Sequence, residues 1–408
     1  GIALEEALEE VERVAREADE TQRMQVVRTT LEGKADSRLC DLFAGLAIQA
    51  ADALSEEDGG EDLERMRVKR LQVRQGNVMG SSLVQGLMLP KSRVDISTPA
   101  NSGGGVVAIV DGGLDHPKLE ISAKIEVDSP GVMQGFHDRA IENLQRQVDH
   151  LASLGVDLLV VRDGIADEAV SLLAKAGITA YRRFERTDLE LLSMMTGAKL
   201  SRDALHIDKG DVGDYAGRSE EAIADVKHTI IEGTCGGAMT LVVRGSSPAV
   251  REEAMRIFDD AIGVAHRLTS KPEILPGGGA IQTHLSRHLR AFAPSQAGRE
   301  QLAIEAYAAA LEIVPRALAD NGGFDSVDVI LALSADQSES GAWIGFDLGK
   351  GKNGDMSEAG ILDPLFLVRH ALSGATEAAI SVLRIDDVLW AKTEIGTPDW
   401  EEEEDSGG

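Results

Sequence analysis

The sequence predicts a multidomain protein of the α and α/β classes, with one domain inserted into another. Strand-like apolar runs crowd the middle of the chain, helical periodicity dominates both ends, and 408 residues are enough for two or three domains. Of these residues 43% are hydrophobic but only 3% are aromatic, so we expect aliphatic cores.

Two helices are expected at the start of the chain. Residues 1–20 carry apolar side chains at helical spacing, among them Leu4 and Val11, and a second helical pattern covers residues 36–54. An acidic loop follows at residues 55–62.

The middle of the chain is expected to alternate strands with helices. Strand-like runs occur at residues 84–89, 106–110, 121–127, 156–161, 178–184 and 240–243. Helical patterns cover residues 134–154 and 168–176. This alternation predicts an α/β domain.

Nearly all of residues 248–318 outside one glycine turn is predicted to be helical. Pro315 interrupts an apolar stripe there, and a kink is expected because proline lacks the N–H that a helix needs. The acidic tail at residues 396–408 has almost no apolar content and is predicted to be disordered.

A formal net charge of -28 argues against nucleic acid as a partner, since no basic stretch could contact phosphates. Lysine is rarer than arginine, and this acidic composition indicates adaptation to concentrated salt, as in a halophilic archaeon. A very acidic bacterial chain is the alternative.

The sequence also predicts a cytoplasmic protein with no membrane partner. No apolar run approaches the ~20 residues that cross a bilayer, and residues 1–20 are acidic and amphipathic, unlike a signal peptide. Cys40 and Cys235 lack metal-ligand spacing, so both are expected to be small buried side chains in a reducing compartment.

A glycine turn, Pro276-Gly277-Gly278-Gly279-Ala280, is the first candidate for a functional site. Three successive glycines have no ordinary packing use, whereas they let backbone N–H groups approach a bound group closely. The positive end of the helix that follows would add to this, which suits a phosphate. A plain tight turn is the alternative.

Three acidic segments are ambiguous when each is taken alone. Asp259 and Asp260 lie off the apolar stripe of residues 250–268, as in a solvated acidic face. Residues 343–347 and 360–364 are short apolar segments that break at an Asp, which is typical of turns.

Together and in this order, these features resemble the C-terminal two-thirds of a group II chaperonin subunit, the thermosome of archaea. The resemblance is collinear from about Asp19 to Lys392 and is poorest at residues 48–127. Its segments include residues 30–34, 155–161, 176–183, 195–198, 243–246, 276–280, 319–323, 360–365 and 383–388.

The resemblance implies a chaperonin-like division into domains. Residues 1–22 and 271–395 would belong to a helical equatorial ATP-binding domain, residues 23–75 and 227–270 to a discontinuous intermediate domain, and residues 76–226 to an α/β apical domain that holds client protein. Residues 130–154 would form a helical protrusion that acts as a lid. An ordinary amphipathic surface helix fits them equally well.

The resemblance also implies residues for ATP hydrolysis. Asp260 would be the catalytic carboxylate that acts on the attacking water, and Lys34 would sense the γ-phosphate, with an ordinary exposed lysine as the alternative. The other nucleotide-binding residues would be Gly277, Gly278 and Gly279 at the phosphate and ribose side, Gly345 and Asp347 beside the adenine, and Asp363 at the ribose hydroxyls.

The family's Gly-Asp-Gly-Thr-Thr phosphate loop is absent from these 408 residues. We therefore assign no metal ligand in this chain, and expect the Mg²⁺ ligand in a preceding N-terminal segment of a longer subunit. The chain would then be a fragment that is inactive alone, with a naturally degenerate paralogue as the alternative. Gln282 also departs from the family, which usually has Glu there.

The predicted function is that of an ATP-dependent protein-folding chaperone subunit that uses ATP and Mg²⁺. Its partners would be unfolded proteins and other chaperonin subunits in a double ring. The alternative is a passive holdase or scaffold without ATPase activity, and nucleotide dependence separates the two. A dinucleotide-dependent oxidoreductase is disfavoured, since no GxGxxG follows a strand with an acidic residue about twenty positions later.

Overall fold

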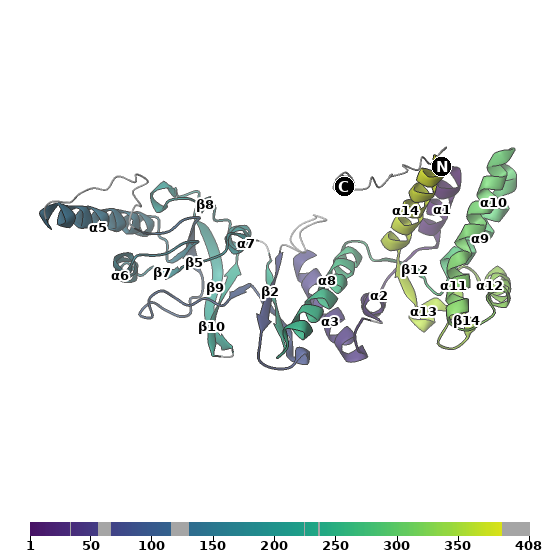
Figure 1. Ribbon diagram of the computed structural model, residues 1–408, viewed down its shortest axis with the longest axis horizontal. Helices are drawn as coiled ribbons and strands as arrows, with labels where there is room; N and C mark the ends of the chain where they lie inside the picture. Colours follow the sequence, from purple (N-terminus) through teal and green to yellow (C-terminus); the bar gives the residue numbers. More distant parts are fainter. Residues whose placement is uncertain (33, 56–66, 116–129, 224, 236, 386–408) are drawn as a thin grey trace, which may run out of the picture. The chain divides into compact units, whose positions relative to one another are not determined.

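The computed structural model describes residues 1–32, 34–55, 67–115, 130–223, 225–235 and 237–385 (Figure 1). The α-helices are α1 (Ile2–Val14), α2 (Glu20–Leu31), α3 (Ser37–Ser55), α5 (Pro130–Ser153), α6 (Asp167–Lys175), α7 (Arg186–Thr196), α8 (Pro248–Ser270), α9 (Ala280–Phe292), α10 (Arg299–Leu311), α11 (Ile313–Asn321), α12 (Ser326–Ser340), α13 (Met356–Ala359) and α14 (Leu365–Leu383).

The strands are short apart from two in the middle of the chain. They are β1 (Arg16–Glu17), β2 (Val68–Val73), β3 (Ser82–Gln85), β4 (Leu87–Leu89), β5 (Gly105–Val110), β6 (Leu158–Val161), β7 (Thr179–Tyr181), β8 (Leu200–Ser201), β9 (Gly213–Ile223), β10 (Val226–Gly233), β11 (Met239–Arg244), β12 (Glu273–Pro276), β13 (Ile344–Asp347), β14 (Lys352–Asp355) and β15 (Leu362–Pro364).

The chain forms two compact units. The first unit contains Gly1–Arg16, Ile274–Ala359 and the chain from Asp363 onward. The second unit contains Glu17–Glu273 with Gly360–Leu362. The second unit is thus almost entirely an insertion within the sequence of the first.

A mixed sheet in the order β4-β10-β9-β5-β6-β7 forms the α/β part of the second unit. β5, β6 and β7 are parallel, and β8 also runs parallel to β5. β9, β10 and β4 pair in antiparallel fashion.

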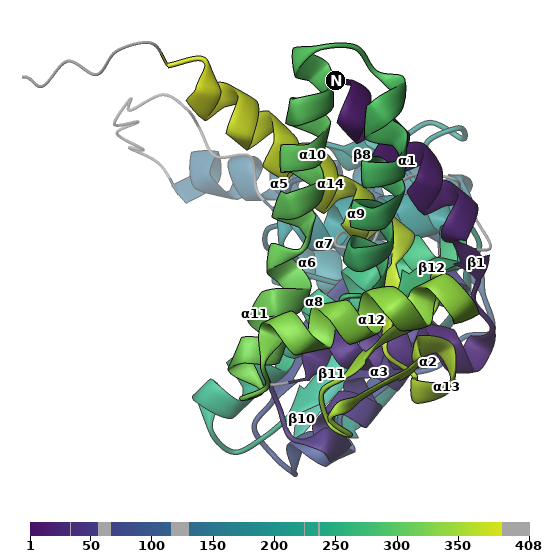
Figure 2. The ribbon, with the colours of Figure 1, turned by 90° about the vertical axis from the view of Figure 1, so that its right-hand side faces the viewer.

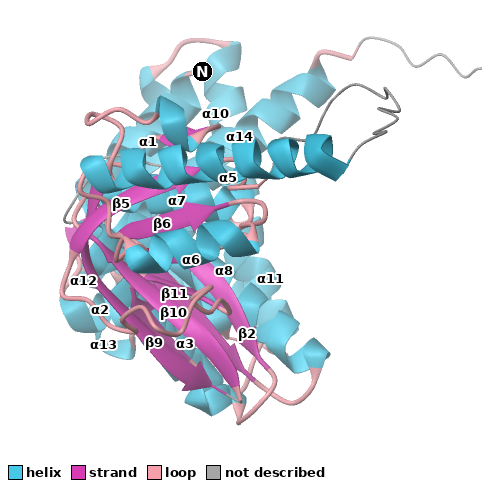
Figure 3. Cartoon of the chain, turned by 90° about the vertical axis from the view of Figure 1, so that its left-hand side faces the viewer, coloured by secondary structure: helices cyan, strands magenta, loops and turns pink. Residues whose placement is uncertain are grey.

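Helices cover both faces of this sheet because its central strands bury side chains on both faces. Val107 and Ile109 of β5 pack with Leu189 and Leu192 of α7. The alternate residues of β5 and β6 pack on the opposite face against α5 and α6, which lie in front of the strands in Figure 3. The period of two along β5 therefore builds two separate cores.

A second layer of this unit joins a three-stranded sheet to three helices. β11 lies between β2, to which it is parallel, and β3, to which it is antiparallel. Helices α2, α3 and α8 pack on one another. Arg23 of α2 ties them together, since its Nη2 donates to Asp52 Oδ1 of α3 at 2.6 Å and to Thr269 Oγ1 of α8 at 2.5 Å.

The first unit is mainly helical. Helix α9 contacts α1 and α10, and α1 also contacts α14 (Figure 2). Its core is aliphatic, as expected, and consists mainly of Ala7, Val11, Leu275, Ile281, Leu285, Leu289, Ile304, Ala308, Leu311, Leu365, Val368 and Leu372. The described part of this unit also contains α11, α12, α13 and the β13–β14 hairpin.

Several expected elements differ from those observed. The first helix ends at Val14, and β1 occupies residues that were expected to be helical. The strand expected at residues 84–89 is broken at Gly86, whose φ is +95° and whose added Cβ would lie 2.6 Å from the carbonyl oxygen of Ile231. The strand expected at residues 121–127 and the tail at residues 396–408 lie outside the described residues.

Near Pro315, where a kink was expected, the helical pattern is broken. Helix α10 ends at Leu311 and α11 begins at Ile313, so the break falls at Glu312. Pro315 has no N–H for the helical hydrogen bond that the carbonyl oxygen of Leu311, four residues earlier, would accept, and α10 ends at Leu311.

Cys40 is buried as expected, but the prediction for Cys235 is wrong, because its side chain is exposed. Cys235 follows β10 in a turn, where its backbone N–H donates to the carbonyl oxygen of Met195. None of the described helices has the length and apolarity that a membrane crossing requires.

Candidate functional site

The predicted site residues fall on both units. Lys34 and Asp260 belong to the second unit, whereas the glycine turn, Asp347 and Asp363 belong to the first.

Lys34 and Asp260, which are 226 positions apart in the sequence, form an ion pair. Lys34 Nζ lies 2.7 Å from Asp260 Oδ2, and the two side chains are 47% and 48% exposed. Lys34 follows α2 in a short loop, whereas Asp260 projects from the middle of α8. A half-exposed pair of this kind is weakly held, so a stronger ligand of either group can displace it.

The neighbouring Asp259 is held by a different cation. Arg70 of β2 donates to Asp259 Oδ1 from Nε at 3.1 Å and from Nη2 at 2.5 Å. The guanidinium carbon also lies 5.9 Å from the centre of the buried Phe258 ring. Two adjacent carboxylates of α8 are therefore neutralised by cations from two separate segments.

The glycine turn is tightly packed, and the expectation that it has no packing use is wrong. Gly278 and Gly279 have φ values of +61° and +71°. A Cβ on Gly278 would lie 2.7 Å from both Met356 Sδ and the carbonyl oxygen of Phe346, and one on Gly279 would lie 2.6 Å from Pro315 Cβ. These two glycines are required by backbone conformation and close packing, whatever the turn binds.

The turn also joins two of the predicted site segments. The Phe346 N–H donates to the carbonyl oxygen of Gly278 at 2.9 Å, which places β13 directly against the turn. Gly345 is buried there, and an added Cβ would lie 2.7 Å from the carbonyl oxygen of Gly277. Helix α9 then begins at Ala280 with no side-chain cap, and an uncapped helix start favours an anion.

Asp347 is engaged within its own hairpin. Lys350 Nζ lies 2.7 Å from Asp347 Oδ2, and the Lys350 N–H donates to Oδ1 at 3.1 Å. Lys350 holds the pKa of the Asp347 carboxyl below its usual value. This carboxylate closes the turn of the β13–β14 hairpin.

Asp363 has the opposite environment. Asp363 is half-buried, and its partial loss of water raises the pKa of its carboxyl group, with no described cation or N–H group to offset this. Gln282 of α9 lines the same groove, and its Oε1 is buried without a hydrogen-bond partner among the described residues. Two acceptors without donors mark one part of the groove as suited to a ligand that carries hydroxyl or N–H groups.

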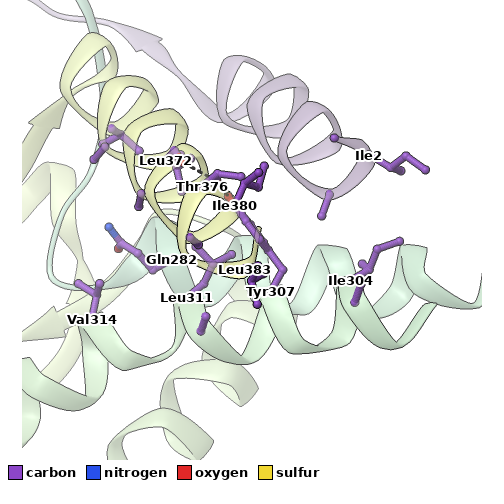
Figure 4. Close-up of a pocket in the computed structure, with 18 of the residues that line it drawn as sticks. Ile2, Gln282, Ile304, Tyr307, Leu311, Val314, Leu372, Thr376, Ile380 and Leu383 are labelled. Carbon is purple, nitrogen blue, oxygen red and sulfur yellow. Dashed lines mark hydrogen bonds between the residues drawn. The ribbon is translucent and has the colours of Figure 1, made fainter. Parts of the chain in front are cut away.

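The groove itself has a volume of about 710 Å³ and is otherwise apolar. It lies along α10 and α14, with Ile2 of α1 at one end and Val314 at the other (Figure 4). Tyr307 and Thr376 face each other across it, with their hydroxyl oxygens 3.0 Å apart. We call it the α10–α14 groove.

Within the described ranges, no group of three or more His, Cys, Asp and Glu side chains is arranged to hold a metal ion. The residues present therefore match the nucleoside part of a nucleotide better than its magnesium ion. Asp363 and Gln282 offer acceptors to ribose hydroxyls, and the uncapped start of α9 suits phosphate oxygens.

Sequence reasoning missed Arg70, Asp259 as its partner, and Lys350. Nothing in the local pattern around Arg70 or Asp259 connects them, because they are 189 positions apart. The role of Lys350 could have been predicted, since a lysine three residues after an Asp in a Gly-rich turn can pair with that Asp and close the turn.

Comparison with known proteins gives one consistent result. The model of the TCP-1/cpn60 chaperonin family matches residues 1–393. The chain is 35% identical over 409 residues to "Thermosome subunit 1" of Haloferax volcanii, a match that covers 99% of this chain and 72% of the relative. It is 34% identical over 398 residues to the thermosome subunit of Methanopyrus kandleri, covering 96% of this chain and 73% of that protein.

A solved structure agrees with the sequence matches. The open-state monomer of a group II chaperonin from Methanococcoides burtonii superposes with a TM-score of 0.73 at 25% sequence identity, over 94% of this chain and 90% of that one. The mixture of helical and α/β parts described above is the fold of that protein. This chain therefore belongs to the TCP-1/cpn60 chaperonin family, on its group II or thermosome side, whose subunits are ATP-driven protein-folding chaperones.

Proposed function

We propose that Asp260 is the catalytic carboxylate of an ATPase site and that Lys34 is its partner when no nucleotide is bound. The observation that carries this proposal is the 2.7 Å ion pair between them. A catalytic carboxylate must reach solvent, and Asp260 is 48% exposed on the rigid helix α8. A lysine that senses phosphate must be free to leave its resting partner, and this pair is exposed enough to separate.

The chemistry assigned to these residues is limited. Bound Mg²⁺·ATP supplies the phosphoanhydride bond and the metal charge that neutralises the phosphates. Asp260 accepts a hydrogen bond from the attacking water, orients it and can take its proton, a role that typically contributes about 10²–10⁴-fold in rate. Lys34 leaves Asp260 and donates to phosphate oxygens, which frees the carboxylate only when nucleotide is present.

We also propose nucleotide contacts for residues of the first unit. Gly277, Gly278 and Gly279 with the start of α9 would meet the phosphates, and Asp363 the ribose hydroxyls. Gly345 and Asp347 would border the base, with Asp347 acting through the hairpin that Lys350 closes.

Other features of the function follow from the family. Chaperonins of this family assemble into rings and bind unfolded proteins. For this chain we propose client binding within residues 76–226, assembly with other subunits in a double ring, and work in the cytoplasm of a salt-adapted archaeon, for which the net charge of -28 is the support.

The test needs a form of the chain that hydrolyses ATP. We also propose that these 408 residues, which contain no Gly-Asp-Gly-Thr-Thr run, do not hydrolyse ATP by themselves. The ATP-hydrolysing form would be a fusion with the part of Haloferax volcanii thermosome subunit 1 that the match does not cover. Phosphate release by the 408 residues alone, abolished by Asp260→Ala, would contradict this second proposal.

In the fusion, Asp260→Ala should lower kcat by about 10² or more and leave nucleotide affinity nearly unchanged, because the carboxylate serves the transition state. Glu253→Ala, which removes an exposed carboxylate from the same helix, is the matched control and should leave kcat unchanged. Equal effects of the two substitutions would refute the role of Asp260. Client binding that ignores nucleotide would instead favour the holdase function.

A further inference from the structure

Strand β2 carries two successive cations that reach opposite neighbours. Successive side chains of a strand point to opposite faces of its sheet. Lys69 pairs with Asp188 in the first turn of α7, while Arg70 pairs with Asp259 of α8. The strand therefore contacts a helix of the α/β part on one face and the helix of Asp260 on the other.

The contact between Lys69 and Asp188 is buried. The Asp188 side chain is only 5% exposed and the Lys69 side chain 26% exposed. A carboxylate this deeply buried needs its counter-charge, so Asp188 and Lys69 have to remain together while α7 is docked on β2.

The contact between β2 and α7 is not closely packed around this ion pair. A cavity of about 400 Å³ lies between β2 and α7, lined by Val68, Lys69 and Arg70 on one side and chiefly by Asp188, Leu191 and Met194 on the other. A contact held by a charge pair beside a cavity can open or shift at lower cost than one filled with apolar side chains.

The contact between Arg70 and Asp259 bears directly on Asp260. Arg70 is only 19% exposed, and both its Nε and its Nη2 donate to the same oxygen of Asp259. Two donors fix the orientation of this turn of α8 and cancel the charge of Asp259 beside Asp260. Without Arg70, an uncompensated carboxylate would stand next to the residue that must work close to a triphosphate.

We propose that β2 couples the docking of α7 to the positioning of Asp260, with Arg70 as the positioning residue and the pair of Lys69 with Asp188 as the link to α7. This inference rests on the proposed function of Asp260. It adds that the carboxylate works at full rate only when both cations of β2 hold their partners.

The first test uses the 408-residue chain without nucleotide, so it does not depend on the ATPase. Arg70→Gln and Asp188→Asn should each speed hydrogen exchange of the α8 amides at Asp259 and Asp260 about tenfold. Glu220→Gln, which breaks the buried pair of Arg93 and Glu220 elsewhere in the same unit, should leave these amides unchanged. Equal acceleration by all three substitutions would show general loosening and overturn the proposal.

The second test measures ATP turnover by the fusion protein. Arg70→Gln should lower kcat about tenfold with KM for ATP within about twofold, Arg70→Lys should restore most of the rate, and Asp188→Asn should lower kcat several-fold. In an Asp260→Asn background none of these changes should lower kcat further, because they act through Asp260. Additive losses in that background would overturn the proposal.

The catalytic role of Asp260 and the coupling through β2 can be refuted separately. If Asp260→Asn leaves kcat unchanged, the proposed function fails, whereas the exchange test still decides the coupling. If Asp188→Asn does not fold, the neutral pair of Lys69→Gln with Asp188→Asn removes both charges and keeps the shapes. That double variant should show the same faster exchange at Asp260, and its failure to do so would overturn the link to α7.

Discussion

Replacing Gly278 by alanine tests whether the glycine turn is a packing element as well as a candidate binding element. At φ +61° an alanine is strained by about 1–2 kcal/mol. Its Cβ would also lie 2.7 Å from the Phe346 carbonyl oxygen and from Met356 Sδ. Overpacking of this kind costs about 1–3 kcal/mol. We therefore expect Gly278→Ala to lower the free energy of unfolding of the first unit by about 2–5 kcal/mol.

Tryptophan emission during urea unfolding can report this loss. Trp343 is 6% exposed in the first unit, and its indole Nε1–H donates to the carbonyl oxygen of Val14 at 3.2 Å. Phenylalanine would replace Trp390 and Trp400, which lie outside the described residues, so that the signal comes from Trp343 alone. With a slope of about 2 kcal/mol per molar urea, the midpoint should fall by about 1–2.5 M.

The control is Gly374→Ala in the middle of α14, in the same unit. An added Cβ at Gly374 meets nothing within 4 Å. Alanine is favoured over glycine inside a helix by about 1 kcal/mol, so this variant should be more stable than the parent. If Gly278→Ala proves as stable as the parent, the turn is loosely packed and our reasoning is wrong.

Three further predictions concern stability. Asp363→Asn should be more stable than the parent at neutral pH, where partial burial of the ionised carboxyl is costly. This advantage should shrink as the pH falls toward the unfolded-state pKa of about 3.9. Thermal melts in which the two melting temperatures differ by the same amount at every pH would contradict it. The melting temperature should rise with potassium chloride, since 1 M salt shortens the Debye length to about 3 Å and screens a charge of -28; a flat or falling trend would count against salt adaptation. Leu285→Ala in the core of the first unit should cost about 2–5 kcal/mol in urea unfolding, whereas Leu302→Ala, at a site 65% exposed, should change little, and equal losses would mean that the core is misplaced.

The fold was predictable where a periodic pattern is strong. Helix α8 and strands β5 and β6 could be predicted from the spacing of their apolar residues, because those residues form the buried faces of these elements. The long strands β9 and β10 were missed, since polar residues such as Glu221 and Lys227 make up much of them and their burial does not alternate regularly. The break at Gly86 depends on a contact with Ile231, far along the chain.

The candidate site was predictable only in its residue types. The glycine turn and Asp260 stand out in the sequence, but the partners of Asp259 and Asp260 come from segments about two hundred positions away. A propensity argument cannot find such pairs, because they are set by tertiary packing. For the same reason the burial of Asp363 and the engagement of Asp347 by Lys350 could not be told apart beforehand, since both residues are single carboxylates next to turns.

The insertion of the second unit also affects the order of events on the ribosome. Helix α1 is made well before its partner α9, which begins about 270 residues later. At a synthesis rate of about 5–20 residues per second, α1 waits roughly 15–55 seconds for that partner. Throughout this delay Ala7 and Val11, which are fully buried in the finished fold, lack the apolar side chains of α9 that pack on them. A protein that folds others is therefore itself exposed to misassembly while α1 waits for α9.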